Sequence, residues 1–323
     1  MGTEPSSDIR TASSWTFACP ICRNALQQHS VEARCAACDR IYPCSSEIWR
    51  FLPEEHLSRY EQFLHDYRII RTDQGWGQPD SAYFLALPEV AADDPQAKIW
   101  QRRRESRRVL LGDIIEPMAA RRKRPLRIAD LGAGNCWLAY GLAELGHMVA
   151  AVDLSVDETD GLGARRWYVP ELERRNRVPF TSIQAEFDRL PWTDHALDVA
   201  LFNASLHYSL DCAVTLREAV RVLSPHGVVV IMDSPVYRRA SSGKAMVRER
   251  ERAYEDLYGF RSDSLPAEHF LTTGRLEELA REVGLRWQTH SLAGSRTRVT
   301  GHWRRLRGQR ELAEMPVVAG TCS

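Results

Sequence analysis

The chain has 323 residues, enough for a catalytic domain of about 200 residues and one or two smaller units. Its 43 basic and 43 acidic side chains cancel, so net charge gives no reason to expect a nucleic-acid or anionic membrane partner. No segment approaches the roughly 20 apolar residues of a membrane span, and residues 1–14 lack the apolar run of a signal peptide. We therefore expect residues 1–14 to be disordered, the protein to be cytoplasmic, and no membrane partner.

Two cysteine pairs lie in a turn-rich stretch that we interpret as a module over residues 15–56. Cys19 and Cys22 form one C-x-x-C pair, Cys35 and Cys38 form the other, and twelve residues separate them. This spacing is typical of a zinc ribbon, in which four thiolates surround one ion. A redox pair or a chance cluster is the alternative. Because four thiolates leave no position for water, we expect a structural zinc that supplies folding energy to a module with its own core.

Helix-forming residues dominate residues 57–125, which we expect to form a helical lead and lid. Tyr60, Phe63, Leu64 and Tyr67 fall at helical spacing. Arg71 lies four residues after Tyr67 and therefore shares its face of the helix. It either pairs with a carboxylate of a ligand or is a solvated charge.

Short apolar runs alternate with helical segments from residue 126 to the end of the chain. This alternation indicates an α/β fold with a mostly parallel sheet and helices on both faces, in which ligands bind beyond the carboxyl ends of the strands. Between the fifth strand and the next helix we expect an insertion at about 234–270 that covers this side. The predicted strands are 126–131, 148–153, 180–184, 197–203, 228–233, 285–290 and 316–319.

A glycine-rich turn follows the first predicted strand. Asp130 precedes Gly132 and Gly134, where the missing β-carbons allow the backbone to approach a ligand closely. A dinucleotide-binding turn would need a third glycine at the position of Trp137, which argues against a nicotinamide enzyme. Asp153 ends the second strand, where a carboxylate can accept hydrogen bonds from two ribose hydroxyls.

The acid-x-Gly-x-Gly turn and the segments after it resemble class I S-adenosylmethionine-dependent methyltransferases with a type 11-like domain, over roughly residues 126–233. The resemblance implies a Rossmann-like, seven-stranded sheet whose last strand pair is antiparallel, with S-adenosylmethionine as cofactor. It implies that Glu186 accepts from the adenine amino group and that Phe187 flanks the ring, with Asp188 as the rival acid. The expected cofactor-binding residues are Asp130, Gly132, Gly134, Asn135, Asp153, Leu154, Glu186, Phe187, Asn203, Tyr67 and Arg71.

The cysteine module, with Ile41-Tyr42-Pro43 after its second pair, resembles the zinc ribbons of methyltransferase activator subunits and those fused ahead of some rRNA guanine methyltransferases. This resemblance raises the possibility of a protein partner bound through the ribbon. Acidic residues outnumber arginines there, whereas a ribbon that grips RNA is ordinarily basic.

His207, just past the fourth predicted strand, is the candidate general base, and packing over the cofactor is the alternative role. We favour a methyltransferase that acts on a small-molecule acceptor. An RNA methyltransferase is the rival within the enzyme class, because of the basic runs at residues 102–104 and 121–124. A non-catalytic protein that binds S-adenosylmethionine and a partner is the alternative from another class.

Overall fold

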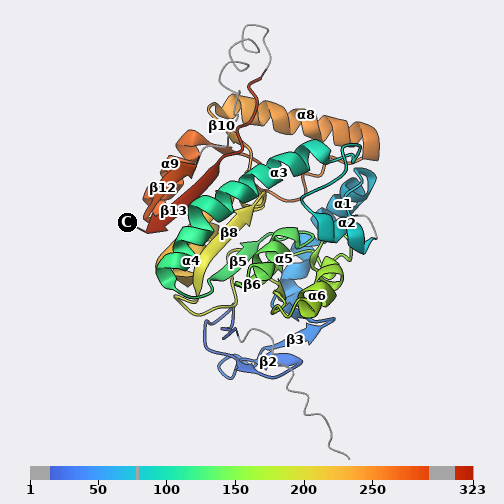
Figure 1. The fold of residues 1–323 in the computed structure, drawn as a ribbon. Coiled ribbons are helices and arrows are strands. Elements are labelled where there is room, and N and C mark those ends of the chain that lie inside the picture. The colour runs from blue at the N-terminus through green and yellow to red at the C-terminus, as the bar shows by residue number, and fades with distance from the viewer. Residues whose placement is uncertain (1–14, 78–79, 291–309, 323) are drawn as a thin grey trace, which may run out of the picture.

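The computed structural model describes residues 15–77, 80–290 and 310–322, so the predicted disorder of residues 1–14 lies outside the described part. Within these ranges one large sheet runs through the molecule, with helices on both faces (Figure 1). The strands are β1 (Gln27–Gln28), β2 (Glu32–Arg34), β3 (Ile41–Ser45), β4 (Ile48–Arg50), β5 (Arg127–Leu131), β6 (Met148–Asp153), β7 (Thr181–Gln184), β8 (Leu197–Asn203), β9 (Leu223–Met232), β10 (Val236–Tyr237), β11 (Leu271–Thr272), β12 (Leu285–His290) and β13 (Val317–Cys322).

Seven neighbouring strands of the sheet come from the region after residue 126, in the order β7-β6-β5-β8-β9-β13-β12. The first five pair in parallel, and β13 is antiparallel to both β9 and β12. This arrangement fits the expected Rossmann-like fold and the expected antiparallel last pair. β10 and β11 form a separate two-stranded parallel sheet.

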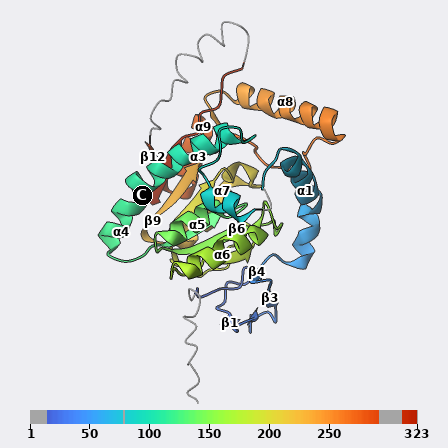
Figure 2. The same ribbon diagram turned by 45° about the vertical axis from the view of Figure 1, so that its right-hand side comes forward.

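Alternate residues of each central strand belong to different cores, because side chains of a strand point to opposite faces in turn. Ile128 lies in the core under α3, α4, α5 and α6, whereas Ala129 lies in the core under α7 and α9 (Figure 2). The helices are α1 (Glu54–Asp73), α2 (Ser81–Ala86), α3 (Ala97–Val109), the π-helical turn η1 (Leu110–Ile115), α4 (Glu116–Arg122), α5 (Trp137–Glu144), the 3₁₀ turn η2 (Leu162–Ala164), α6 (Arg165–Arg174), the 3₁₀ turn η3 (Leu206–Tyr208), α7 (Cys212–Val222), α8 (Ala240–Tyr258) and α9 (Thr273–Val283).

The N-terminal module extends the main sheet, which the sequence did not predict. β4 pairs in parallel with β7, Ile48 opposite Ser182 and Arg50 opposite Gln184, so the sheet has eleven strands in the described part of the chain. Phe17 and Tyr42 are buried in the same core as α7. The expectation that the module has a core of its own is therefore wrong.

Two segments outside the central fold lie over the carboxyl ends of the strands. α1 belongs to the predicted helical lead, and α8, in the predicted insertion, lies beyond the end toward which β8 points (Figure 1). The hydroxyl of Tyr258 at the end of α8 donates a hydrogen bond of 2.7 Å to Asp73 at the end of α1. Among the described helices, none has the length and apolar character needed to cross a membrane.

Candidate functional site

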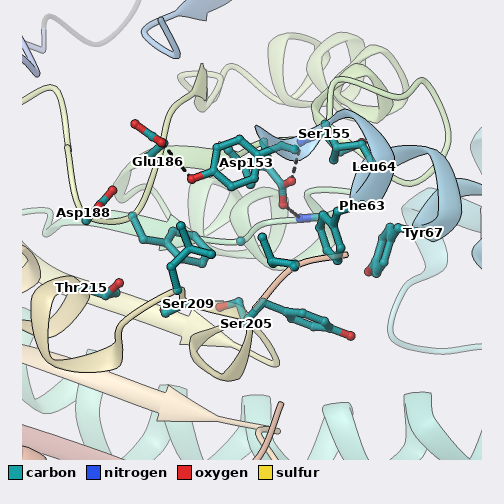
Figure 3. A pocket seen from close by; sticks show the side chains of 18 of the residues that line it. Phe63, Leu64, Tyr67, Asp153, Ser155, Glu186, Asp188, Ser205, Ser209 and Thr215 are labelled. Atoms are coloured by element: carbon teal, nitrogen blue, oxygen red, sulfur yellow. Dashed lines mark hydrogen bonds between the residues drawn. The ribbon is translucent and has the colours of Figure 1, made fainter. Parts of the chain in front are cut away.

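A cavity opens at the carboxyl ends of β5, β6, β7 and β8, beneath α1 (Figure 3). α1 contributes apolar and aromatic walls, and the loops after the strands contribute backbone and acidic groups. Of the predicted cofactor residues, those that line the cavity are Tyr67, Gly132, Gly134, Asp153, Leu154, Glu186 and Phe187, together with the rival acid Asp188.

Asp153 is fixed in the wall of the cavity by two backbone amides. One carboxylate oxygen accepts from Gly134 N and the other from Ser155 N, each at 2.8 Å. Burial nevertheless raises the pKa of Asp153 to about 6, and these two hydrogen bonds oppose the shift. The carboxylate thereby ties the β6 end to the glycine turn.

Asp130 lies behind the turn and is fully buried. The backbone amide of Ala139 lowers its pKa, but otherwise neither carboxylate oxygen has a hydrogen-bond partner among the described residues. Burial, with the charge of Asp153, raises the pKa of Asp130 to about 7. A buried carboxylate without a partner is costly, so this position favours a bound cation.

Glu186 is held by α1. Its carboxylate accepts from Tyr60 Oη at 2.8 Å and lies 2.8 Å from His56 Nδ1. These contacts anchor α1 over the cavity. The contact of Glu186 with adenine stays a prediction, and adenine would have to share a carboxylate that His56 and Tyr60 already contact. The rival acid Asp188 forms no ion pair within the described ranges, and burial raises its pKa.

Arg71 is predicted to bind a ligand, but in the structure its charge is already paired within the chain. Its guanidinium pairs with Asp160, with Nη2 at 3.0 Å from Oδ1, and stacks 3.6 Å above the ring of Trp76. Asp160 lines the cavity, whereas Arg71 is not among its lining residues. A role of Arg71 toward a cofactor carboxylate stays a prediction, and it would require this ion pair to be shared or opened.

Arg103 of α3 is the cation that sequence reasoning missed. Its guanidinium lies between the rings of Trp76 and Trp100, at 5.0 and 4.8 Å from their centroids. It has no hydrogen bond or ion pair among the described residues, yet its charge opposes the rise that burial causes in the pKa values of Asp130 and Asp233. In the sequence the Arg102–Arg104 run supports only the RNA alternative, and the helical spacing from Trp100 to Arg103 is the signal that could have suggested an aromatic contact.

Two other predicted cofactor residues, Asn135 and Asn203, do not line the cavity. Asn135 is buried, and its side-chain oxygen accepts from Trp137 N at the start of α5 at 3.4 Å. Asn203 is also buried, and its side-chain oxygen has no partner within the described part.

His207 is buried beside the cavity, with Nδ1 3.1 Å from Ser234 Oγ. Burial, with the charges of Arg250 and His269, lowers its pKa to about 3. The imidazole is therefore neutral near pH 7 and a weak base, since an effective base has a pKa near the working pH. The packing alternative fits this environment better than general-base catalysis does.

Gly132 is a position where a side chain cannot be accommodated. Its φ is +80°, and a β-carbon would lie 2.3 Å from Ser205 Cβ. We expect Gly132→Ala to lower the free energy of unfolding by about 2 to 4 kcal/mol, through strain and overpacking. Gly134→Ala is the matched control, because φ is +52° but nothing lies within 4 Å, so we expect a loss of about 1 kcal/mol. Urea unfolding measures both; equal losses would contradict the close contact.

The four predicted metal ligands come together in the N-terminal module. All four sulfur atoms lie within 4.8 Å of one another, and the Cys22–Cys35 and Cys19–Cys38 sulfurs are 3.3 and 3.6 Å apart. Four sulfurs around one zinc at about 2.3 Å would be about 3.8 Å apart. The cluster therefore has the ligand type and approximate size of a tetrahedral thiolate site.

Comparison with known proteins gives a match between residues 129–231 and the family model described as "Methyltransferase domain". This stretch of the chain is therefore similar to a methyltransferase domain. This domain covers the glycine turn, Asp153, Glu186 and His207, and leaves the N-terminal module, α1 and α8 outside the match.

Curated relatives share only parts of their length with this chain. The uncharacterized protein YafE of Escherichia coli is 31% identical over 94 residues, which are 29% of this chain and 42% of YafE. A malonyl-[acyl-carrier protein] O-methyltransferase of Halorhodospira halophila is 29% identical over 119 residues, 36% of this chain and 38% of the relative. The chain thus spans about two fifths of these relatives. The crystal structure of YcgJ from Bacillus subtilis aligns with a TM-score of 0.43 at 12% identity, over 61% of this chain and 92% of YcgJ.

Proposed function

We propose that the chain is an S-adenosylmethionine-dependent methyltransferase that transfers a methyl group to a small-molecule acceptor. The observation that carries this proposal is a pair of opposite charges that form no ion pair among the described residues: the buried carboxylate of Asp130, just before the glycine turn that lines the cavity, and the half-buried guanidinium of Arg103. The amino-acid end of S-adenosylmethionine carries one ammonium and one carboxylate, so Asp130 would take the first and Arg103 the second. Asp153 would accept from the ribose hydroxyls, and Phe187 would flank the adenine.

The bound cofactor supplies a methyl group that its sulfonium already activates. The chain's own residues have to hold the acceptor in line and exclude water, and such positioning contributes roughly 7 to 11 kcal/mol. No base of suitable pKa is needed for an acceptor atom that carries a free electron pair without a proton.

The cover over the cavity supports a small acceptor. Leu265 of the insertion lines the cavity, as do four residues of α1: Tyr60, Phe63, Leu64 and Tyr67. The names of the curated relatives from Halorhodospira halophila and Dechloromonas aromatica refer to an acyl-carrier-bound malonyl group, which also favours a small acceptor group over RNA.

The basic runs that motivated an RNA substrate are largely used within the fold. Arg103 lies over the ring of Trp100, Arg122 donates to Pro225 O at 2.7 Å, and Arg124 pairs with Asp198 at 2.8 Å. On the insertion side, Arg310 pairs with Glu249 at 2.7 Å. Arginines that are already paired add little to a phosphate-binding strip.

The test is formation of S-adenosylhomocysteine by the purified protein with either the low-molecular-weight fraction of a cell extract or total RNA. We expect turnover with the small-molecule fraction alone. Turnover with RNA alone would contradict the acceptor class. Binding of S-adenosylmethionine without turnover in either arm would favour the non-catalytic alternative.

We also propose that Cys19, Cys22, Cys35 and Cys38 hold one structural zinc, supported by the sulfur geometry above. A protein partner bound through this module stays a prediction.

Arg103→Gln tests the assignment of the cofactor carboxylate. We expect the dissociation constant for S-adenosylmethionine to rise roughly tenfold to hundredfold, because a charge-assisted hydrogen bond contributes about 1.5 to 3 kcal/mol. Arg108→Gln on the same helix is the control, since Arg108 is exposed and forms no ion pair with a described residue. Isothermal titration measures both, and equal affinities for the two variants would exclude Arg103 from the cofactor site.

A further inference from the structure

A second polar cluster lies behind Tyr208, which forms part of the cavity wall. We call it the Arg250 cluster; it consists of Arg250 on α8, His207 in η3 and His269 just before β11. His269 N donates to His207 O at 2.8 Å, and the His207 ring lies 4.5 Å from that of Tyr208. The charge of Arg250 acts on the pKa values of His207, Tyr208 and His269, so this α8 residue lies near the other two segments beside the cavity.

Arg250 has no partner in this cluster. It forms no hydrogen bond or ion pair with any described residue, and its Nε atom is buried. Nδ1 of His269 is buried and unpaired as well. The neighbouring Glu249 pairs outward with Arg310 at 2.7 Å, so it does not serve Arg250. Buried donors without acceptors are costly, so this arrangement favours an anion at Arg250.

Near pH 7 the positive charge of the cluster comes from Arg250 alone. Burial, with the charge of Arg250, lowers the pKa of His269 to about 4 and that of His207 to about 3, so both rings are neutral near pH 7. Asp263 is the acid that acts on His269, and it raises the pKa of that ring. One guanidinium with neutral imidazoles matches a carboxylate, whereas a phosphate dianion would bring a second negative charge without a second cation.

We propose that the Arg250 cluster binds a carboxylate group of the methyl acceptor, an inference that rests on the proposed function. Tyr208 contacts the cluster on one side and lines the cofactor cavity on the other. A carboxylate held by Arg250 would therefore place the rest of the acceptor against Tyr208, at the cavity that also contains Gly132 and Asp153. Guanidinium groups hold carboxylates through paired N–H donors, which fixes orientation as well as position.

The experiment uses the full chain saturated with S-adenosylhomocysteine, so that cofactor binding is established before any acceptor is added. Monomethyl malonate, which has one carboxylate, is titrated against it by calorimetry, beside dimethyl malonate and inorganic phosphate. Arg250→Gln is compared with Arg252→Gln, an exposed arginine on the same helix without an ion pair among the described residues.

We expect saturable binding of monomethyl malonate alone, and a dissociation constant that rises about tenfold or more in Arg250→Gln but not in Arg252→Gln. Both variants should bind S-adenosylhomocysteine as the unmodified chain does. No binding of monomethyl malonate, equal binding of dimethyl malonate, preferential binding of phosphate, or equal effects of the two substitutions would each overturn the proposal. Failure to bind S-adenosylhomocysteine would instead overturn the proposed function.

Discussion

Cys35→Ser is expected to release the zinc and to lower the stability of the whole chain. Zinc binding to structural thiolate sites contributes apparent free energies of about 10 to 16 kcal/mol, so the module cannot keep its fold without the fourth ligand. β4 would then leave the edge of β7, and Phe17 would leave the core that it shares with α7. We expect the melting temperature of the single transition to fall on the order of 10 °C.

Cys44→Ser is the matched control for this prediction. Cys44 lies in the same module and is half-buried, but its sulfur is not part of the four-sulfur cluster. Elemental analysis should show one zinc per chain for the unmodified protein and for Cys44→Ser. Scanning calorimetry should show a melting temperature near that of the unmodified protein for Cys44→Ser only. An unchanged main transition in Cys35→Ser would mean that the module folds independently of the sheet.

Asp153→Ala is expected to weaken binding of S-adenosylmethionine by roughly 2 to 4 kcal/mol. Two losses add up in this variant. The ribose hydroxyls would lose a charged acceptor, and Gly134 N would lose the carboxylate that fixes the glycine turn at 2.8 Å.

The control for Asp153→Ala is Asp194→Ala, which removes an exposed carboxylate that pairs with Arg221 away from the cavity. Isothermal titration of both variants gives the comparison. An affinity of Asp153→Ala within twofold of the unmodified chain would show that the end of β6 does not hold the ribose.

The central fold could be predicted because its signals are local. Apolar runs such as 148–153 end at an acid or a glycine, and β6 has these bounds. The two C-x-x-C pairs are also a local signal, and their sulfurs meet as expected. The pairing of β4 with β7 joins residues more than a hundred positions apart, and no local pattern marks it.

The roles of charged residues were harder to predict, because they depend on which partners the fold brings near. Arg71 and Arg103 both lie on helices before the domain, yet within the described part of the chain only Arg71 forms an ion pair, with Asp160. Glu186 has the position that the family resemblance implies, but His56 and Tyr60 of α1 already use its carboxylate. Such competition is set by tertiary packing, which spacing along the chain does not encode.

The most direct test of the account is calorimetric titration of the purified chain with S-adenosylmethionine and, separately, with NAD. The arrangement of Asp130, Arg103 and Asp153 predicts that one molecule of S-adenosylmethionine binds per chain and that NAD neither binds nor competes. Absence of S-adenosylmethionine binding, or tighter binding of NAD, would contradict the assignment of this cavity.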